Sequence, residues 1–189
     1  LFQADGTTAI GNSDFITDVQ ALAGLKFTPL ANSTVAGSFD VESSQDGSTV
    51  AAQSGVATST ITVNAAPILT AGATLVHSEG DAPAVIDNTI TIVDTDSNVL
   101  VSATIQITGN RQAGSVDVLT KPAGGGISGM TWIPSTGTLT LIGTASVSQY
   151  QAALRTVTFV NTSDSPSTLD RTITWTVNDG LANSLPQTS

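Results

Sequence analysis

Two stretches of this chain repeat the same order of residues, and this internal repeat constrains the fold more than any other feature of the sequence. The copies span residues 16–47 and 147–180. Each has the pattern of a short helical turn, a strand, a polar loop, a second strand and an Asp-Gly turn. A gap of one residue brings identical residue types into register, namely Gln20 with Gln151 and Phe27 with Phe159. The repeat predicts two structural units of one kind in tandem.

The second copy shows the helical and strand periods most clearly. Val147, Tyr150 and Leu154 lie at helical spacing, and Ser146 stands where a residue would cap the start of that helix. Alternating apolar residues then predict half-buried strands. Further alternating or β-branched runs predict more strands, at residues 60–63, 68–76, 89–93, 101–107, 116–119, 138–142, 157–159 and 173–177. Short strands between regular turns predict an all-β chain of tandem antiparallel β-sandwiches.

The charge balance limits the partners of the chain. Five basic residues stand against fifteen acidic ones, for a net charge of −10. Binding to nucleic-acid phosphates or to an anionic membrane surface is therefore disfavoured. Thirteen of the acids are Asp, whose carboxylate suits hard divalent cations. The chain has no Cys, which excludes disulfides and thiolate metal sites, and no apolar run long enough to span a membrane.

The repeat and a Pro-containing junction predict the domain boundary. The strand at residues 60–63 runs into Asn64-Ala65-Ala66-Pro67. We expect residues 1–65 to be the C-terminal part of one sandwich, without its front half. Residues 66–189 are expected to form a second sandwich that lacks its closing strand. Strand edges left open in this way could be filled by a neighbouring chain.

Several motifs, taken in order, suggest a family. They are Asn64-Ala65-Ala66-Pro67, Glu79-Gly80-Asp81, Asp94-Thr95-Asp96-Ser97, Ser135 to Leu141, Ser148 to Leu154, and Thr176 to Gly180. This pattern resembles the cadherin-like, Ig-like tandem repeats of large bacterial RTX-type adhesins and surface proteins, and it covers nearly the whole chain. The resemblance implies a secreted protein at the bacterial cell surface or outside the cell, in which calcium stiffens a string of sandwiches.

The resemblance also implies which residues bind the calcium. They are Glu79, Asp81, Asp94, Asp96 and Asp179, which would converge at one pole of the second sandwich. The linker departs from the family pattern, because Asn64-Ala65-Ala66-Pro67 replaces an acidic run, so one or two ions are expected there. The alternative is that these aspartates only form turns by binding their own backbone. Asp46 is the counterpart of Asp179 in the first copy.

Enzymatic function finds little support. His77 is the only histidine, it stands in an alternating run that suggests a surface strand residue, and no feature activates a particular serine. Trp132 and Trp175 lie in apolar surroundings and are expected to anchor the core rather than to bind sugar. We therefore expect neither catalysis nor an organic cofactor.

Two functions remain open. In the first, the chain is a structural repeat segment that extends, stiffens or assembles a surface structure, with neighbouring repeats or copies of itself as partners and a filament as one outcome. In the second, it is an adhesin domain that recognises a glycan or a host protein through calcium-bearing loops at residues 109–115 or 121–130. Neither function requires nucleic acid or insertion into a membrane.

Overall fold

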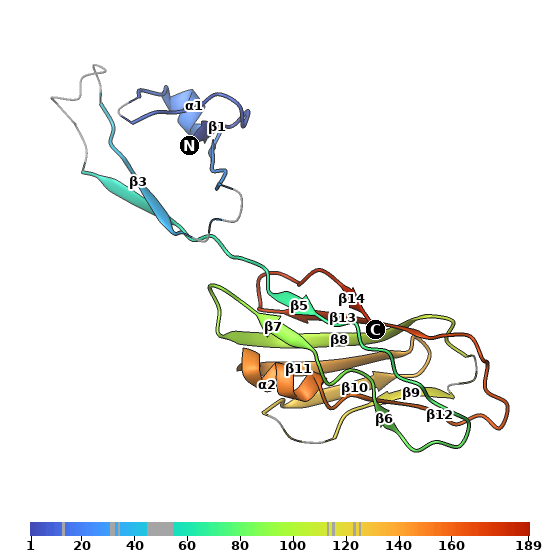
Figure 1. Ribbon diagram of the computed structural model, residues 1–189. Helices are drawn as coiled ribbons and strands as arrows, with labels where there is room; N and C mark the ends of the chain where they lie inside the picture. Colours follow the sequence, from blue (N-terminus) through green and yellow to red (C-terminus); the bar gives the residue numbers. More distant parts are fainter. Residues whose placement is uncertain are drawn as a thin grey trace. The chain divides into compact units, whose positions relative to one another are not determined.

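The computed structural model describes residues 1–12, 14–30, 33, 35–44, 55–112, 114, 116–122, 124 and 126–189. It divides the chain into two compact units, Leu1–Val63 and Asn64–Ser189, so the division falls close to the predicted boundary. Antiparallel strands account for most of the regular structure in both units. This confirms the all-β fold class (Figure 1).

Unit 1 consists of one helix and two pairs of strands. The elements are β1 (Phe2–Gln3), α1 (Asp18–Leu22), β2 (Leu25–Lys26), β3 (Gly37–Val41) and β4 (Ala57–Ile61). β1 pairs with β2 and β3 pairs with β4, both antiparallel. None of the described residues of unit 1 is buried. The unit therefore has regular structure but no closed apolar core among its described residues.

Unit 2 contains the other strands and one longer helix. The elements are β5 (Ile68–Thr70), β6 (Ala84–Val85), β7 (Thr91–Val93), β8 (Val99–Gly109), β9 (Asp117–Thr120), β10 (Gly129–Ile133), β11 (Thr138–Ser146), α2 (Val147–Leu154), β12 (Thr158–Asn161), β13 (Thr172–Asn178) and β14 (Gln187–Thr188). The strands form sheets in the orders β10-β11-β8-β13-β14, β6-β12-β9 and β5-β7.

The longest strand of unit 2, β8, lies between β11 and β13 and pairs with both. Its inward residues Ala103, Ile105 and Ile107 are buried, as their alternation predicts. Trp175 pairs with Ile105 from β13 and is fully buried, whereas Trp132 is half-buried and packs at the edge of the core. Buried residues from β5, β7, β9, β12 and α2 complete a single core in unit 2.

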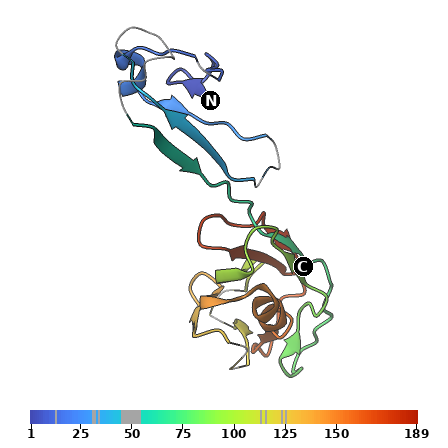
Figure 2. The same cartoon turned by 90° about the vertical axis from the view of Figure 1, so that its left-hand side faces the viewer.

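Both helices begin with the same capping arrangement. In α2 the Ser146 hydroxyl accepts a hydrogen bond from the backbone N–H of Gln149, whose side chain accepts one from the N–H of Ser146. Thr17 and Gln20 make the same pair of bonds at the start of α1. Ser146 is thus confirmed as the cap, and α2 contributes Tyr150, Ala153 and Leu154 to the core of unit 2, where its coil lies beside the strands (Figures 1 and 2).

The capping arrangement corrects the alignment of the repeat. Gln20 corresponds to Gln149 by its role in the cap, and not to Gln151 as the one-residue gap suggested. The C-caps of the two helices, Ala23 and Arg155, each lie four residues before the aligned phenylalanine. The helical segment of the first copy is therefore three residues shorter, because α1 has about one turn less than α2.

Candidate functional site

Two places in unit 2 gather polar groups. The first, which we name the aspartate cluster, consists of Asn64, Asp94, Asp96 and Asp179. The second is a groove between residues 73–79 and 164–173. The described part of the chain contains no helix long and apolar enough to span a membrane.

Asp96 and Asp179 hold the first residues of unit 2. One carboxylate oxygen of Asp96 accepts a hydrogen bond from the backbone N–H of Ala65, at 3.1 Å. The Asn64 side-chain amide donates to Oδ2 of Asp179, at 2.9 Å. Asp96 follows β7 and Asp179 follows β13, so two loops far apart in the sequence bind two consecutive residues. The start of unit 2 is therefore fixed by side chains from both loops.

Two aspartates of the cluster, Asp94 and Asp179, also shape their own turns. Oδ1 of Asp94 accepts from the N–H groups of Asp96 and Ser97. Oδ1 of Asp179 accepts from the N–H groups of Leu181 and Ala182, at 2.7 Å each. Turn formation thus accounts for one oxygen of each side chain.

The second oxygen of Asp94 differs from all the others in the aspartate cluster. Oδ2 of Asp94 is buried and has no hydrogen-bond partner. Burial, and then the neighbouring Asp96 carboxyl, raise the pKa of Asp94. For Asp179 burial also acts to raise the pKa, but hydrogen bonds from Ala182, Asn64 and Leu181 outweigh it and lower the pKa. Asp94 is therefore the member of the aspartate cluster with a buried carboxylate oxygen that no donor meets.

The donor set of the aspartate cluster fits a hard cation in part. Carboxylate and amide oxygens are the ligands that calcium prefers, and an unpartnered buried oxygen is a suitable first ligand. Among the described residues, however, no group of three or more His, Asp or Glu side chains is arranged to hold a metal ion. An ion here would need backbone carbonyls and water as further ligands.

The other two expected ligands lie elsewhere in unit 2. Oδ2 of Asp81 accepts a hydrogen bond from the backbone N–H of Ser78, within its own turn. Glu79 lines the groove together with residues 159–173. The structure thus brings together Asp94, Asp96 and Asp179 by way of Asn64 and Ala65, but not Glu79 and Asp81. Asp46 lies outside the described residues.

The groove has a volume of about 890 Å³ and a mixed lining. Leu75, Ile86, Phe159 and Ile173 supply apolar surface, and Ser165, Ser167 and Thr168 add short polar side chains. One wall is the segment between β5 and β6, and the other precedes β13. Its size is that of a pocket for a small ligand.

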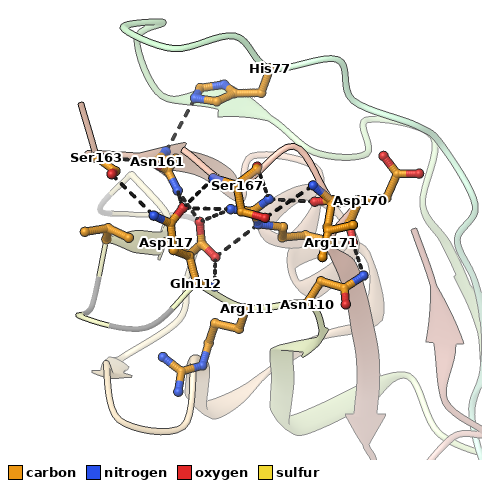
Figure 3. A network of polar contacts seen from close by, with 12 residues as sticks. His77, Asn110, Arg111, Gln112, Asp117, Asn161, Ser163, Ser167, Asp170 and Arg171 are labelled. Atoms are coloured by element: carbon orange, nitrogen blue, oxygen red, sulfur yellow. Dashed lines mark hydrogen bonds and ion pairs between the residues drawn. The ribbon is translucent and has the colours of Figure 1, made fainter. Parts of the chain in front are cut away.

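A buried polar network supports one wall of the groove (Figure 3). Asp117 is buried on β9 and pairs with Arg171, with 3.2 Å between Oδ2 and Nε. Asn161 donates to Oδ1 of Asp117, and the backbone N–H of Gln112 donates to Oδ2. Arg171 also donates to the carbonyl oxygens of Ser167 and Leu169. The network therefore fastens the loop before β13 to β9 and β12.

His77 does not occupy a surface strand, which corrects the prediction from its alternating context. It is half-buried outside any strand, and its ring meets that of Phe159 edge-on at 5.3 Å. Nε2 accepts from the backbone N–H of Asn161 at 3.4 Å, while Nδ1 is buried without a partner. The ring turns inward because Phe159 and Asn161 offer it both packing and a donor.

Sequence reasoning missed the Asp117–Arg171 pair, although a signal was present. Asp117 and Leu119 are two residues apart on one strand, so they share its inward face. A charge on an inward face requires a buried partner of opposite sign, and the chain has only five basic residues to choose from.

Comparisons with known proteins gave no match. No protein-family model, no curated protein and no solved structure matches this chain at a significant level.

Proposed function

We propose that this chain is a non-enzymatic structural segment of an extracellular, bacterial surface protein, built from Ig-like β-sandwich repeats. Two features support this proposal: the repeated helix-strand-strand pattern, and the antiparallel sheets around one core in unit 2. In this function the chain extends or assembles a surface structure.

We further propose that calcium stabilises the start of unit 2 through the aspartate cluster. The observation that carries this proposal is the buried, unpartnered Oδ2 of Asp94 next to the Asp96 carboxylate. A divalent cation would compensate both charges. Because Asp96 and Asp179 bind Asn64 and Ala65, an ion there would stiffen the residues that directly follow unit 1.

Calorimetric titration of the chelator-treated chain with calcium tests the site. We expect heat of binding that is lost in Asp96→Asn and retained in Asp81→Asn, because the Asp81 carboxylate binds its own turn. The matched pair changes the same residue type in each case. Binding that depends on Asp81 and not on Asp96 would place the ion elsewhere, and no binding would remove calcium from the proposal.

A second candidate function is ligand binding in the groove. Its volume of about 890 Å³ and its mixed lining favour this reading over loops 109–115 and 121–130, which are only partly described. A glycan array probed with and without a calcium chelator tests it. Specific binding that Ser167→Trp abolishes would support an adhesin, because Ser167 lines the groove and an indole there would fill it.

A further inference from the structure

Unit 1 exposes apolar side chains whose counterparts in unit 2 are buried. Counterparts are assigned by the aligned phenylalanine and by the match of Phe39-Asp40-Val41 with Trp175-Thr176-Val177. The paired exposed fractions differ widely: Leu22 86% and Leu154 1%, Phe27 42% and Phe159 9%, Val41 44% and Val177 1%. The same elements therefore lack, in unit 1, the cover that they have in unit 2.

The hairpin at the start of unit 1 also has a counterpart in unit 2. Phe2 bridges Ala9, and Trp132 pairs with Leu139 in the β10–β11 hairpin. Both pairs are antiparallel and span the same number of residues. Residues 2–9 thus correspond to the turn that enters β11, just as β3 corresponds to β13.

The missing cover is identified by what lies between these elements in unit 2. There β8 pairs with β11 on one edge and with β13 on the other. In unit 1, β3 pairs only with β4 among the described residues, and no described strand stands in the position of β8. The edge of β3 away from β4 carries backbone groups that can pair with a further strand.

We propose that the free edge of β3 accepts an antiparallel strand with the pattern of β8, from a polypeptide segment that repeats the strand order of residues 68–109. Such a strand alternates small or β-branched apolar residues, as Ala103, Ile105 and Ile107 do in β8. These side chains would cover Phe39 and Val41, as Ile105 and Ala103 pair with Trp175 and Val177. The inference rests on the proposed assembly role and names the surface through which it acts.

A second copy of this chain is a poor donor of that strand. Its own β8 is paired on both edges, and Ile105 is fully buried in the core of unit 2. Releasing β8 would expose that core and break both ladders. The occupant is therefore a segment whose β8-like strand has no partner of its own.

The probe is a synthetic peptide with the sequence of Val99–Gly109 and flanking lysines for solubility. We expect it to bind the full chain in fluorescence anisotropy, and to slow amide exchange in residues 37–41. A control peptide with Ile105→Asp and Ile107→Asp keeps the length but loses the apolar face, so its affinity should fall at least about tenfold.

Variants of the chain locate the binding surface. Phe39→Asp should abolish binding, whereas Ser38→Asp, on the opposite and exposed face of β3, should retain it. Leu22→Ser tests binding with little risk of misfolding, because the Leu22 side chain is exposed and contributes little to unit 1 itself. This substitution should weaken peptide binding several-fold.

Three results would overturn the inference. The first is that the peptide does not bind the chain. The second is slower amide exchange in β13 and not in β3, which would mean that the peptide replaces β8 of unit 2. The third is dimers that form without peptide and depend on Phe39, which would make a second copy the occupant. All three are distinct from failure of the calcium titration, which reports on unit 2.

Discussion

At the scale of single residues, unit 2 contains a buried ion pair between Asp117 and Arg171. The Asp117 side chain is fully buried, and the Arg171 side chain is 11% exposed. A buried ion pair contributes little net stability compared with apolar residues of similar volume. Removing one partner, however, leaves the other charge buried without a counter-charge. Replacing Asp117 and Arg171 together by apolar residues should therefore cost unit 2 far less stability than replacing either one alone.

Arg171→Ala should lower the free energy of unfolding of unit 2 by about 3–5 kcal/mol. The measurement is urea unfolding followed by tryptophan fluorescence, which reports on unit 2 because Trp132 and Trp175 both belong to it. Arg111→Ala is the control, since Arg111 binds only exposed carbonyl groups and should cost about 1 kcal/mol or less. Equal effects of the two changes would contradict the account of the network.

Asp87 should make unit 2 sensitive to acid. Burial acts to raise the pKa of Asp87, but hydrogen bonds from Thr89, Ala73 and Gly72 outweigh it and hold the pKa well below its usual value. A lowered pKa gives stability that is present above the unfolded pKa of 3.8 and is lost as pH falls towards the folded pKa. Urea unfolding below pH 4 should therefore show a loss of stability that is smaller in Asp87→Asn. An unchanged pH profile in this variant would refute the assignment.

At the scale of secondary structure, alternation predicted the inward faces of β8, β12 and β13 because these strands are buried on one side and their side chains alternate between the two faces of the sheet. The run at residues 68–76 was predicted as one strand, but β5 ends at Thr70. The Asp87 carboxylate binds the N–H groups of Gly72 and Ala73. A carboxylate that follows the run by more than ten residues captures these donors, and periodicity carries no sign of it.

The expected calcium ligands fall into two groups. Asp96 follows β7 and Asp179 follows β13, two strands of different sheets, and both side chains bind the first two residues of unit 2. Glu79 and Asp81 lie between β5 and β6, where no regular strand fixes their position. Just before them His77 turns inward towards Phe159, which a single histidine in an alternating run does not reveal.

The capping box of α2 should be measurable as a local contribution to stability. Ser146→Ala removes the acceptor for the N–H of Gln149 and should lower the free energy of unfolding of unit 2 by about 1 kcal/mol. Thr168→Ala, in an exposed loop, is the control and should have little effect. If the two variants unfold at the same urea concentration, the cap does not stabilise α2.

At the scale of the whole molecule, the two units share one order of helix and strands, but the described part of unit 1 contains fewer of the strands. Unit 2 encloses β8 between two neighbours and has a closed core, whereas the described part of unit 1 has the flanking elements without the central strand. A structural segment made of such units would gain order from its neighbours along the chain or across an assembly. Unit 1 should accordingly exchange its amides faster than unit 2 until a partner strand is added.

The effect of Asp94→Asn on the stability of unit 2 should depend on whether calcium is bound. Without calcium, Asp94→Asn should raise the midpoint of thermal unfolding of unit 2, because it removes a negative charge whose Oδ2 is buried without a partner next to Asp96, while the amide oxygen can keep the turn. With calcium, the same change removes a ligand and should reduce the gain in stability. A destabilised variant in chelator would contradict this assignment.

The central claim is tested most directly by thermal unfolding of the full chain in chelator and in millimolar calcium, followed by tryptophan fluorescence. An ion that binds only the folded state raises its stability by mass action. We predict a clear upward shift of the unit 2 midpoint with calcium, abolished in the Asp94→Asn, Asp96→Asn double variant and kept in Asp81→Asn. An equal midpoint in both buffers would contradict the account and leave the aspartates of the cluster as turn formers.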